Sequence, residues 1–365
     1  MKIRSMKRST RTNLITYLGV IIAFVATVIL RDSGGLSRSL TGQLVPICCY
    51  MSMAVSLNLT VGILGELSLG HAGFMSVGAF SGVIAAMSLQ SAIPSDALRL
   101  AVAMIVGAAV AAVAGVVIGT PVLRLRGDYL AIVTLAFGEI IKELVNCLLV
   151  GWDSRGLHVA LNLTGDKSIA DLGLETEGIA IIKGAQGATS TATISTFTAG
   201  FVLVLITLFV VLNLKDSRAG RAIMALRDNS IAAESVGLNL TKYKLMAFVT
   251  SAALAGAAGA LYGLNFSSLQ ASKFDFNTSI LILVFVVLGG LGNMWGSVIA
   301  AAALTILPEA LRQFSDYRML VYAIVLILVM LATNNPTLKG FFSRLFHRER
   351  ADAPHAAAVK GGGKQ

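Results

Sequence analysis

The sequence predicts an all-α integral membrane protein with about ten transmembrane helices, Gly-rich broken segments and both termini in the cytoplasm. Hydrophobic residues make up 56% of the 365 residues and charged residues only 13%, with a mean hydropathy of +0.79, whereas soluble domains carry about 25% charged residues. Apolar runs of about 20 residues, the length that crosses a bilayer, recur along the chain. The net charge of +10 comes from short basic clusters between those runs, which indicates membrane orientation and not a nucleic-acid-binding face.

Eight of the expected helices are uninterrupted apolar runs. The first follows a basic arm, but its 17 residues exceed the signal-peptide core of about 7–15 residues. Because Arg31-Asp32 follows it in place of a small-residue cleavage site, we expect a retained helix. A ninth region, 280–307, is interrupted at Gly289–Asn293 and is long enough for two short helices. The eight runs are Leu14–Leu30, Leu44–Leu64, Ala72–Leu89, Leu98–Gly119, Tyr129–Val150, Phe197–Leu214, Leu245–Leu264 and Met319–Ala332.

The distribution of Lys and Arg predicts the orientation. With the N-terminus in the cytoplasm and ten crossings, the cytoplasmic segments hold 19 of these residues and the outer segments hold 9. Such an excess marks the cytoplasmic side. The chain then divides into a basic arm with the first helix (1–43), a membrane core that contains a cytoplasmic loop at 215–244 (44–332), and a basic cytoplasmic tail that we expect to be disordered (333–365).

Small residues at four-residue spacing predict close helix packing, because lipid offers no hydrophobic drive for helix association and short side chains let helices approach. A path lined by backbone is the alternative interpretation of the same pattern. Two helices carry such stripes, one formed by Gly107, Ala111, Gly115 and Gly119 and the other by Ala252, Gly256 and Ala260.

Two Gly-rich segments put non-helical backbone near the membrane. The first, Gly62–Gly73, contains Glu66, Ser68 and His71, and the second is Gly289–Gly296. Such backbone is tolerated only where protein or a water-filled cavity satisfies it, and paired broken segments point to a transport pathway. Ordinary interfacial turns remain the alternative. A lone His is weak evidence for a proton relay, so we favour a hydrogen-bonded structural role for His71.

The run Tyr129–Val150 carries a polar stripe. At 100° per residue, Glu139, Lys142, Glu143 and Asn146 fall within one arc of about 100°. One charge at the bilayer centre costs about 3 kcal/mol or more, so the stripe must face protein or water. It is either a wall of a permeation path or partner contact, or a buried ion pair that fixes packing.

The loop 215–244 combines charge with apolar residues. It holds six basic and three acidic residues, and Ile223, Met224, Leu226 and Ile231 form an apolar thread through it. Asp228, Asn229 or Ser230 can cap a helix start and Gly237 can end it, which predicts a short helix over Ile231–Val236 after a helical stretch at Arg221–Leu226. Such a mixed surface favours docking to a soluble partner over a plain solvated loop.

Four long sequence blocks occur in one order within residues 44–332. They are Gly65–Phe80, Gly127–Ile140, Gly220–Gly263 and Val287–Gly296. Together they resemble the permease subunits of bacterial ABC importers for branched-chain amino acids, in particular the longer of the two permease types. Two segments depart from that pattern: Asn334–Gly340 lacks the expected Pro-x-Gly-Leu end, and the outer loop 151–194 is longer and more irregular.

The resemblance implies a multi-pass subunit of the bacterial inner membrane with three kinds of protein partner: a second, similar permease subunit, two cytoplasmic ATPase subunits and a periplasmic solute-binding protein. It also implies that the loop inserts a coupling helix into the ATPase. Ala232-Ala233 and Gly237 match the general importer signature, whereas Ile231 stands where that signature has Glu. The residues assigned to this coupling loop are Arg221, Leu226, Arg227, Asp228, Ala232, Ala233, Glu234 and Gly237.

Solute import driven by ATP is the leading hypothesis. The sequence contains no Gly-x4-Gly-Lys-Ser/Thr phosphate loop, so we expect no cofactor in this chain and place ATP and Mg on the partner subunits. Family members import branched-chain amino acids, urea or short amides. The alternative is an ion-coupled secondary transporter or channel that uses Glu139, Lys142 and Glu143.

An enzyme is the third hypothesis, and it lacks support because no nucleophile–base set or metal cluster is visible. We therefore assign no catalytic residue and no metal ligand. Cys48, Cys49 and Cys147 lie in apolar runs, and we expect them to act as small core residues.

Overall fold

The computed structural model describes residues 8–35, 37–125, 127–162, 169–173, 178–189 and 191–311, together with 323, 324 and 327. The chain divides into two compact units, Met1–Ala310 and Leu311–Gln365, and the helices and strands named below all belong to the first unit. The predicted helix Met319–Ala332 lies almost entirely outside the described residues, and the predicted tail 333–365 lies wholly outside them.

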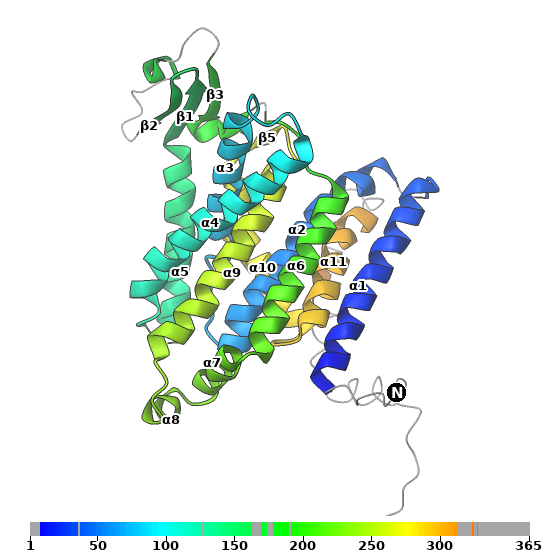
Figure 1. Ribbon diagram of the computed structural model, residues 1–365, viewed down its shortest axis with the longest axis vertical. Helices are drawn as coiled ribbons and strands as arrows, with labels where there is room; N and C mark the ends of the chain where they lie inside the picture. Colours follow the sequence, from blue (N-terminus) through cyan, green and yellow to red (C-terminus); the bar gives the residue numbers. More distant parts are fainter. Residues whose placement is uncertain are drawn as a thin grey trace, which may run out of the picture. The chain divides into compact units, whose positions relative to one another are not determined.

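Helices dominate the first unit, as predicted (Figure 1). Within the part of the chain that the structure describes, six apolar helical stretches are long enough to cross a membrane, and Met294–Glu309 is a shorter apolar one. The structure is thus that of a helical, multi-pass membrane protein. In chain order the helices are α1 (Arg8–Asp32), α2 (Arg38–Asn58), α3 (His71–Ser88), α4 (Asp96–Val122), α5 (Asp128–Asn146), α6 (Phe197–Asp216), α7 (Arg218–Asp228), α8 (Ser230–Ser235), α9 (Leu240–Gly263), α10 (Phe276–Gly289) and α11 (Met294–Ala310).

Local capping explains where several helices begin. The side chains of Ser37, Thr196 and Asp275 accept hydrogen bonds from backbone N–H groups in the first turns of α2, α6 and α10, which satisfies donors that have no partner inside the helix. One predicted boundary is wrong: the helix expected over Tyr129–Val150 ends at Asn146, and the chain continues as a strand. The apolar run Leu148–Val150 fits a strand as well as a helix, because a short apolar run does not distinguish the two.

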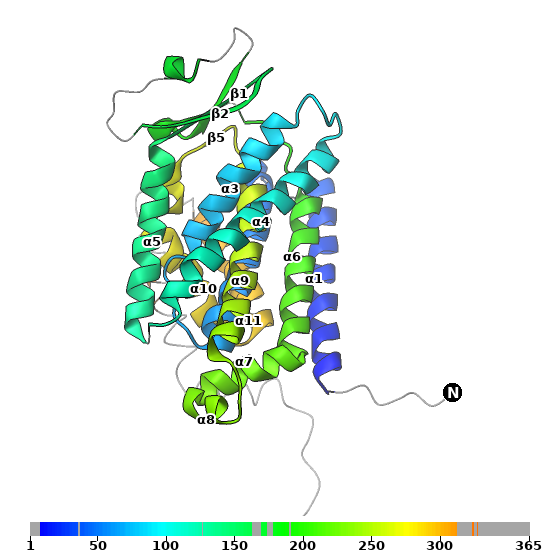
Figure 2. The same cartoon turned by 60° about the vertical axis from the view of Figure 1, so that its left-hand side comes forward.

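A five-stranded antiparallel sheet covers the end of the helices opposite α7 and α8, which Figure 2 shows clearly. No strand was predicted for the outer loop 151–194, so the sheet is an addition to the expected all-helical fold. Its strand order is β2-β1-β3-β4-β5, and β5 arrives from the segment after α9. The strands are β1 (Leu148–Asp153), β2 (Gly156–Leu161), β3 (Ile179–Lys183), β4 (Ala188–Thr189) and β5 (Ser268–Leu269).

The core lies where α3, α4 and α9 cross, and it is built on the two small-residue stripes predicted above. A Cβ added to Gly256 of α9 would lie 2.3 Å from Cβ of Ala111 on α4, and one added to Gly78 of α3 would lie 2.1 Å from the Gly256 carbonyl oxygen. Backbones this close leave no room for a larger side chain. The packing interpretation of the stripes is therefore confirmed.

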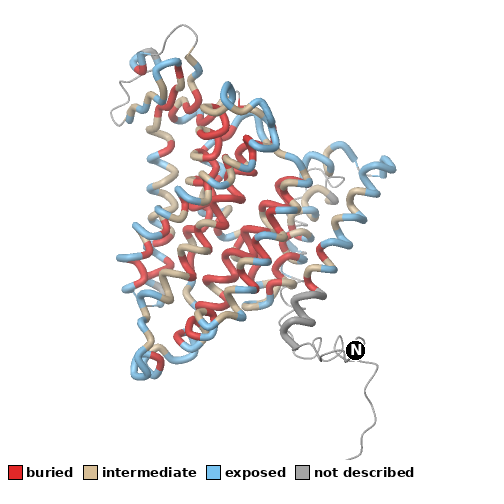
Figure 3. Tube along the Cα trace, viewed as in Figure 1, coloured by how far each residue is buried: buried red, intermediate tan, exposed pale blue. Residues whose placement is uncertain are grey.

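Burial is uneven across the helices (Figure 3). Most of α2, α3 and α9 is buried, whereas α1 and α5 present long exposed apolar stretches. Helix α1 contacts the rest of the unit mainly through α6, where Phe24 stacks on Phe197 and Phe201 with ring centroids 5.1 and 3.9 Å apart. The edge helices are consequently the surfaces left for lipid or for partner subunits.

Replacing Gly256 with Val tests the close packing of α9. The added side chain would collide with the Ala111 side chain and the Gly107 backbone of α4, so we expect a loss of about 3 kcal/mol, the upper end of overpacking costs. The measurement is the thermal unfolding midpoint and the monodisperse yield in detergent. Gly42→Val is the matched control, because a Cβ on Gly42 of α2 meets no atom within 4 Å. Equal midpoints for the two variants would contradict the packing argument.

Candidate coupling junction and translocation face

The first Gly-rich break begins as a change in helix type. After Asn58, α2 continues as a π-helix over Leu59–Leu64, and it ends at Gly65, whose φ is +81°. That left-handed conformation favours glycine, and a Cβ on Gly65 would also lie 2.7 Å from Cγ of Arg227. Residues 65–70 then run without helical structure to the start of α3. π-Helical turns are frequent at functional sites, which makes this end of α2 a candidate functional site.

The two Gly-rich breaks meet at Asn58, which is fully buried. Its carboxamide oxygen accepts a hydrogen bond from the Gly292 backbone N–H at 2.8 Å. Its nitrogen lies 2.7 Å from Ser297 Oγ, 3.3 Å from the Asn293 carbonyl oxygen and 3.4 Å from that of Gly290. The Asn58 side chain, just before the first break, thus forms hydrogen bonds with several backbone groups of the second break.

The backbones of the two breaks also touch. A Cβ on Gly62 would lie 2.3 Å from the Gly292 nitrogen, and Gly292 has a φ of +78°. We call the set Asn58, Gly62, Gly290, Gly292 and Asn293 the break junction. It is formed by glycines because the two chain segments approach more closely than any side chain would allow.

The cytoplasmic loop is tied directly to the break junction. Arg227 at the end of α7 donates a hydrogen bond from Nη1 to the Gly62 carbonyl oxygen at 2.5 Å. Lys215 at the end of α6 reaches the Gly292 carbonyl oxygen at 3.4 Å. At the start of α9, Lys244 forms an ion pair with Glu66, and both side chains are at most 15% exposed. All three contacts join a basic residue of the loop to one of the two breaks.

The tip of the loop projects away from the membrane helices (Figure 1). The Asn229 side chain accepts a hydrogen bond from Ala232 N at 3.0 Å and so caps α8, and Gly237, with a φ of +87°, follows its end. The short helix is as predicted within one residue. Helix α8 leaves two large apolar side chains in solvent, Ile231 at 75% and Val236 at 76% exposed. Apolar exposure of this kind on a charged loop is typical of a docking surface.

Three predicted residues of the first break lie in different surroundings. Glu66 is paired with Lys244, as described above. Ser68 is buried, and its hydroxyl has no hydrogen-bond partner among the described residues. His71 is 2% exposed, and its Nε2 lies 2.8 Å from Ser56 Oγ on α2. The structure therefore brings Glu66 to the cytoplasmic loop and His71 into the core between α2 and α3.

The predicted polar stripe lies along the outer half of α5. Lys142 forms an ion pair with Glu139, and its Nζ lies 3.9 Å from Glu143 Oε1. Lys142 is 22% exposed, Glu139 40% and Glu143 67%. On the same exposed side stand Ile140 at 61% and Leu144 at 50%. The stripe is thus a partly paired charge cluster on an open helix face, and it is far from the break junction in sequence and on another helix.

The predicted coupling-loop residues divide into inward and outward groups. Leu226 and Ala233 are buried, and Arg227 points to the first break. The sequence analysis did not identify the residues that join the breaks. Asn58 is one polar residue in an apolar run, and Lys215 and Lys244 are the lysines at the two ends of the loop 215–244. The signal that could have found Asn58 is the cost of burying an amide without partners. Among the described residues, no three His, Cys, Asp or Glu side chains are grouped to hold a metal ion.

Comparison with known proteins places the chain among transporter permeases. Residues 39–330 match the family described as branched-chain amino acid transport system / permease component. The high-affinity branched-chain amino acid transport system permease protein LivM of Salmonella typhimurium is 34% identical over 292 residues, which cover 77% of this chain and 66% of LivM. LivM of Escherichia coli gives the same identity and coverage. The chain therefore spans just under two thirds of the length of these relatives.

A more distant similarity covers a shorter part of the chain. The ribose import permease protein RbsC of Haemophilus influenzae is 31% identical over 129 residues, 33% of this chain and 40% of that protein. No solved structure matches the chain. The fold and the comparisons define a component of a membrane transporter, and the chain belongs to the permease-component family of the branched-chain amino acid transport system.

Replacing Asn58 with Ala tests the break junction. The change leaves the buried Gly292 N–H without its partner and removes the donor to Ser297 Oγ, which still donates to the Asn293 carbonyl oxygen; an unsatisfied buried group costs about 1–3 kcal/mol. We expect a lower thermal midpoint in detergent and faster cleavage by protease near residues 62–66 and 290–293. Asn277→Ala is the control, because the Asn277 side chain is exposed and bonds only locally to Asp275. If Asn58→Ala behaves like that control, the junction does not hold the two breaks together.

Proposed function

We propose that this protein is the membrane-spanning permease subunit of an ATP-driven importer that moves branched-chain amino acids or closely related small solutes. Its complex contains a second, similar permease subunit, two cytoplasmic ATPase subunits and a periplasmic solute-binding protein. ATP and Mg are bound by the ATPases. The family of the chain and the names of its LivM relatives support the substrate class.

The observation that carries the proposal is the connection from α8 to the break junction. The exposed tip at Ile231 and Val236 offers an apolar contact to a soluble protein. Behind the tip, Arg227 and Lys215 hold one carbonyl oxygen in each break. A partner that moves the tip therefore pulls on both breaks together, which biases the equilibrium between two states of the path.

The α5 face supplies the translocation path together with the second permease. Glu143 is 67% exposed even though Lys142 lies 3.9 Å away, and an exposed charged cluster of this kind is unfavourable against hydrocarbon. A water-filled path closed by a partner subunit removes this cost. The ends of a zwitterionic amino acid match a face that carries both signs of charge, and its apolar side chain matches Ile140 and Leu144.

The arrangement of the complex follows from the charge distribution. We place α7, α8 and both termini in the cytoplasm of the bacterial inner-membrane protein, and the β-sheet on the periplasmic side, where a binding protein docks. The excess of Lys and Arg on the cytoplasmic segments supports this orientation.

Replacing Ile231 with Asp tests the docking of α8. A charge in the centre of an apolar contact removes its burial energy, so we expect at least a tenfold loss of ATPase retained on the purified permease, and a matching loss of ATP-dependent uptake in proteoliposomes. Ser235→Asp is the control, because it adds the same charge to an exposed polar position of α8. Uptake that persists without any ATPase and follows an ion gradient would favour the secondary-transporter alternative instead.

Replacing Arg227 with Met separates docking from coupling. The variant loses the hydrogen bond to the Gly62 carbonyl oxygen but leaves α8 intact, so we expect normal ATPase retention with uptake per ATP hydrolysed reduced several-fold. Both quantities are measured on the same reconstituted complex. Arg218→Met, at the exposed start of α7, is the matched control. Unchanged uptake per ATP in Arg227→Met would show that force does not pass through this contact.

A further inference from the structure

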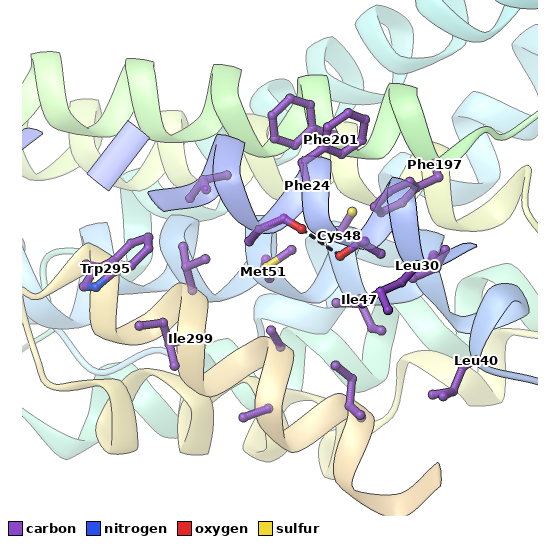
Figure 4. A pocket seen from close by; sticks show the side chains of 18 residues that line it. Phe24, Leu30, Leu40, Ile47, Cys48, Met51, Phe197, Phe201, Trp295 and Ile299 are labelled. Carbon is purple, nitrogen blue, oxygen red and sulfur yellow. Dashed lines mark hydrogen bonds between the residues drawn. The ribbon is translucent and has the colours of Figure 1, made fainter. Parts of the chain in front are cut away.

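An apolar cavity lies between α1 and the helices α2, α6 and α11, and its wall includes Trp295 of the second Gly-rich segment. Its volume is about 500 Å³, within the range of roughly 300–1,000 Å³ for small-molecule sites. Figure 4 shows that side chains from all four helices point into it. Phe24 and Trp295 stand on opposite sides, and the Thr27 hydroxyl on its wall already donates to the Ala23 carbonyl oxygen at 2.8 Å.

The position of α1 explains why the cavity exists. Two contacts, five residues apart in the middle of α1, set its position. Phe24 packs on the rings of α6, and Gly19 lies against the indole of Trp295, where a Cβ would be 2.3 Å from the ring. Thr27 and Leu30, farther along α1, line the cavity together with residues of α2 and α11.

The gap favours hydrocarbon. Water needs two to four polar partners in a cavity, and the lining offers few polar groups: the weakly interacting Cys48 thiol, the Thr27 hydroxyl, which already donates to Ala23, and the Trp295 indole N–H. A polar solute would lose its hydrogen bonds there without replacement. The occupant must also be slender and available inside the membrane, and an acyl chain meets both conditions.

Charge at the cavity's end identifies the rest of the occupant. Leu30 and Leu40 line that end (Figure 4), and the adjoining turn carries Arg31 and Arg38, both exposed. Asp32 pairs with Arg31 at 3.1 Å, so the turn keeps a net positive charge at the membrane surface. A cation beside the mouth of an apolar slot matches the phosphate of a lipid whose tail fills the slot.

From this geometry we infer that the cavity binds one acyl chain of a glycerophospholipid whose phosphate lies beside the turn that joins α1 to α2. The lipid fills the space that α1 leaves open and holds α1 to the core. The inference depends on the membrane location of the chain and not on its transported substrate. It assigns a binding role to residues such as Phe24, Leu40 and Trp295.

Tryptophan fluorescence tests the site, because Trp152 and Trp295 are the only two tryptophans of the sequence. In a Trp152→Phe variant of the full chain, all emission comes from Trp295 in the cavity wall. We titrate the purified protein in detergent with a phosphatidylglycerol brominated along its acyl chains, which quenches indole on contact. The expected result is quenching that saturates near one lipid per protein, with one phospholipid retained in native mass spectrometry.

Two further variants, both in the Trp152→Phe background, decide the outcome. Ala302→Phe fills the cavity and should abolish the saturable quenching and the retained lipid. Val117→Phe introduces the same Phe side chain at a position of α4 that is 66% exposed, and it should change neither the quenching nor the retained lipid. Arg38→Gln should raise the half-saturation concentration roughly two- to fivefold, the effect of losing one exposed ion pair. Quenching that rises without saturation, equally with and without Ala302→Phe, would mean that Trp295 meets bulk lipid only and would overturn the site.

Discussion

Backbone that leaves the helical conformation inside a membrane must find a partner for each N–H and C=O group, and this constraint governs the centre of the structure. One residue, Asn58, connects the two breaks in this way. Asn58 satisfies groups of the second break, while its own segment unwinds into the first. Since lipid supplies no hydrogen bonds, neither break is stable alone. The two breaks, more than 200 residues apart, therefore form one structural unit, and whatever displaces one of them displaces the other.

The basic residues of the cytoplasmic loop gain their significance from this unit. Arg227, Lys215 and Lys244 hold two backbone carbonyl groups and one carboxylate, all belonging to the breaks. A contact between side chain and backbone is well suited to transmit motion, because the carbonyl oxygen moves rigidly with the chain. The loop is thus attached to the membrane core at three points, and its tip at α8 is the part that is free to follow a partner. The exposed tip at α8 and the geometry of the two breaks therefore belong to one connected part of the structure.

Much of this arrangement could be predicted from the sequence, for reasons specific to each element. Apolar runs predicted the helices, the Gly and Ala stripes predicted that α4 and α9 pack closely against neighbours, and Asn229 with Gly237 predicted α8 within one residue, because these patterns are local in the sequence. The sheet was missed because the apolar run of β1 was assigned to a helix, and because β4 and β5 are two residues long and pair across about 80 residues. The break junction was missed for a related reason. The glycine content predicted both breaks, but the contact between them depends on tertiary structure, which no local sequence pattern indicates.

The two ends of the membrane core face opposite demands, and their structures reflect this. At the end that carries α7 and α8, close glycine contacts at Gly62 and Gly292 leave room for small backbone changes only. The opposite end carries an open polar face on α5 and a sheet whose β2 edge exposes Leu157 and Val159. A charged helix face in hydrocarbon and an apolar strand edge in water are both unfavourable. The α5 face and the β2 edge are therefore the surfaces whose cover by further protein would stabilise this part of the chain most.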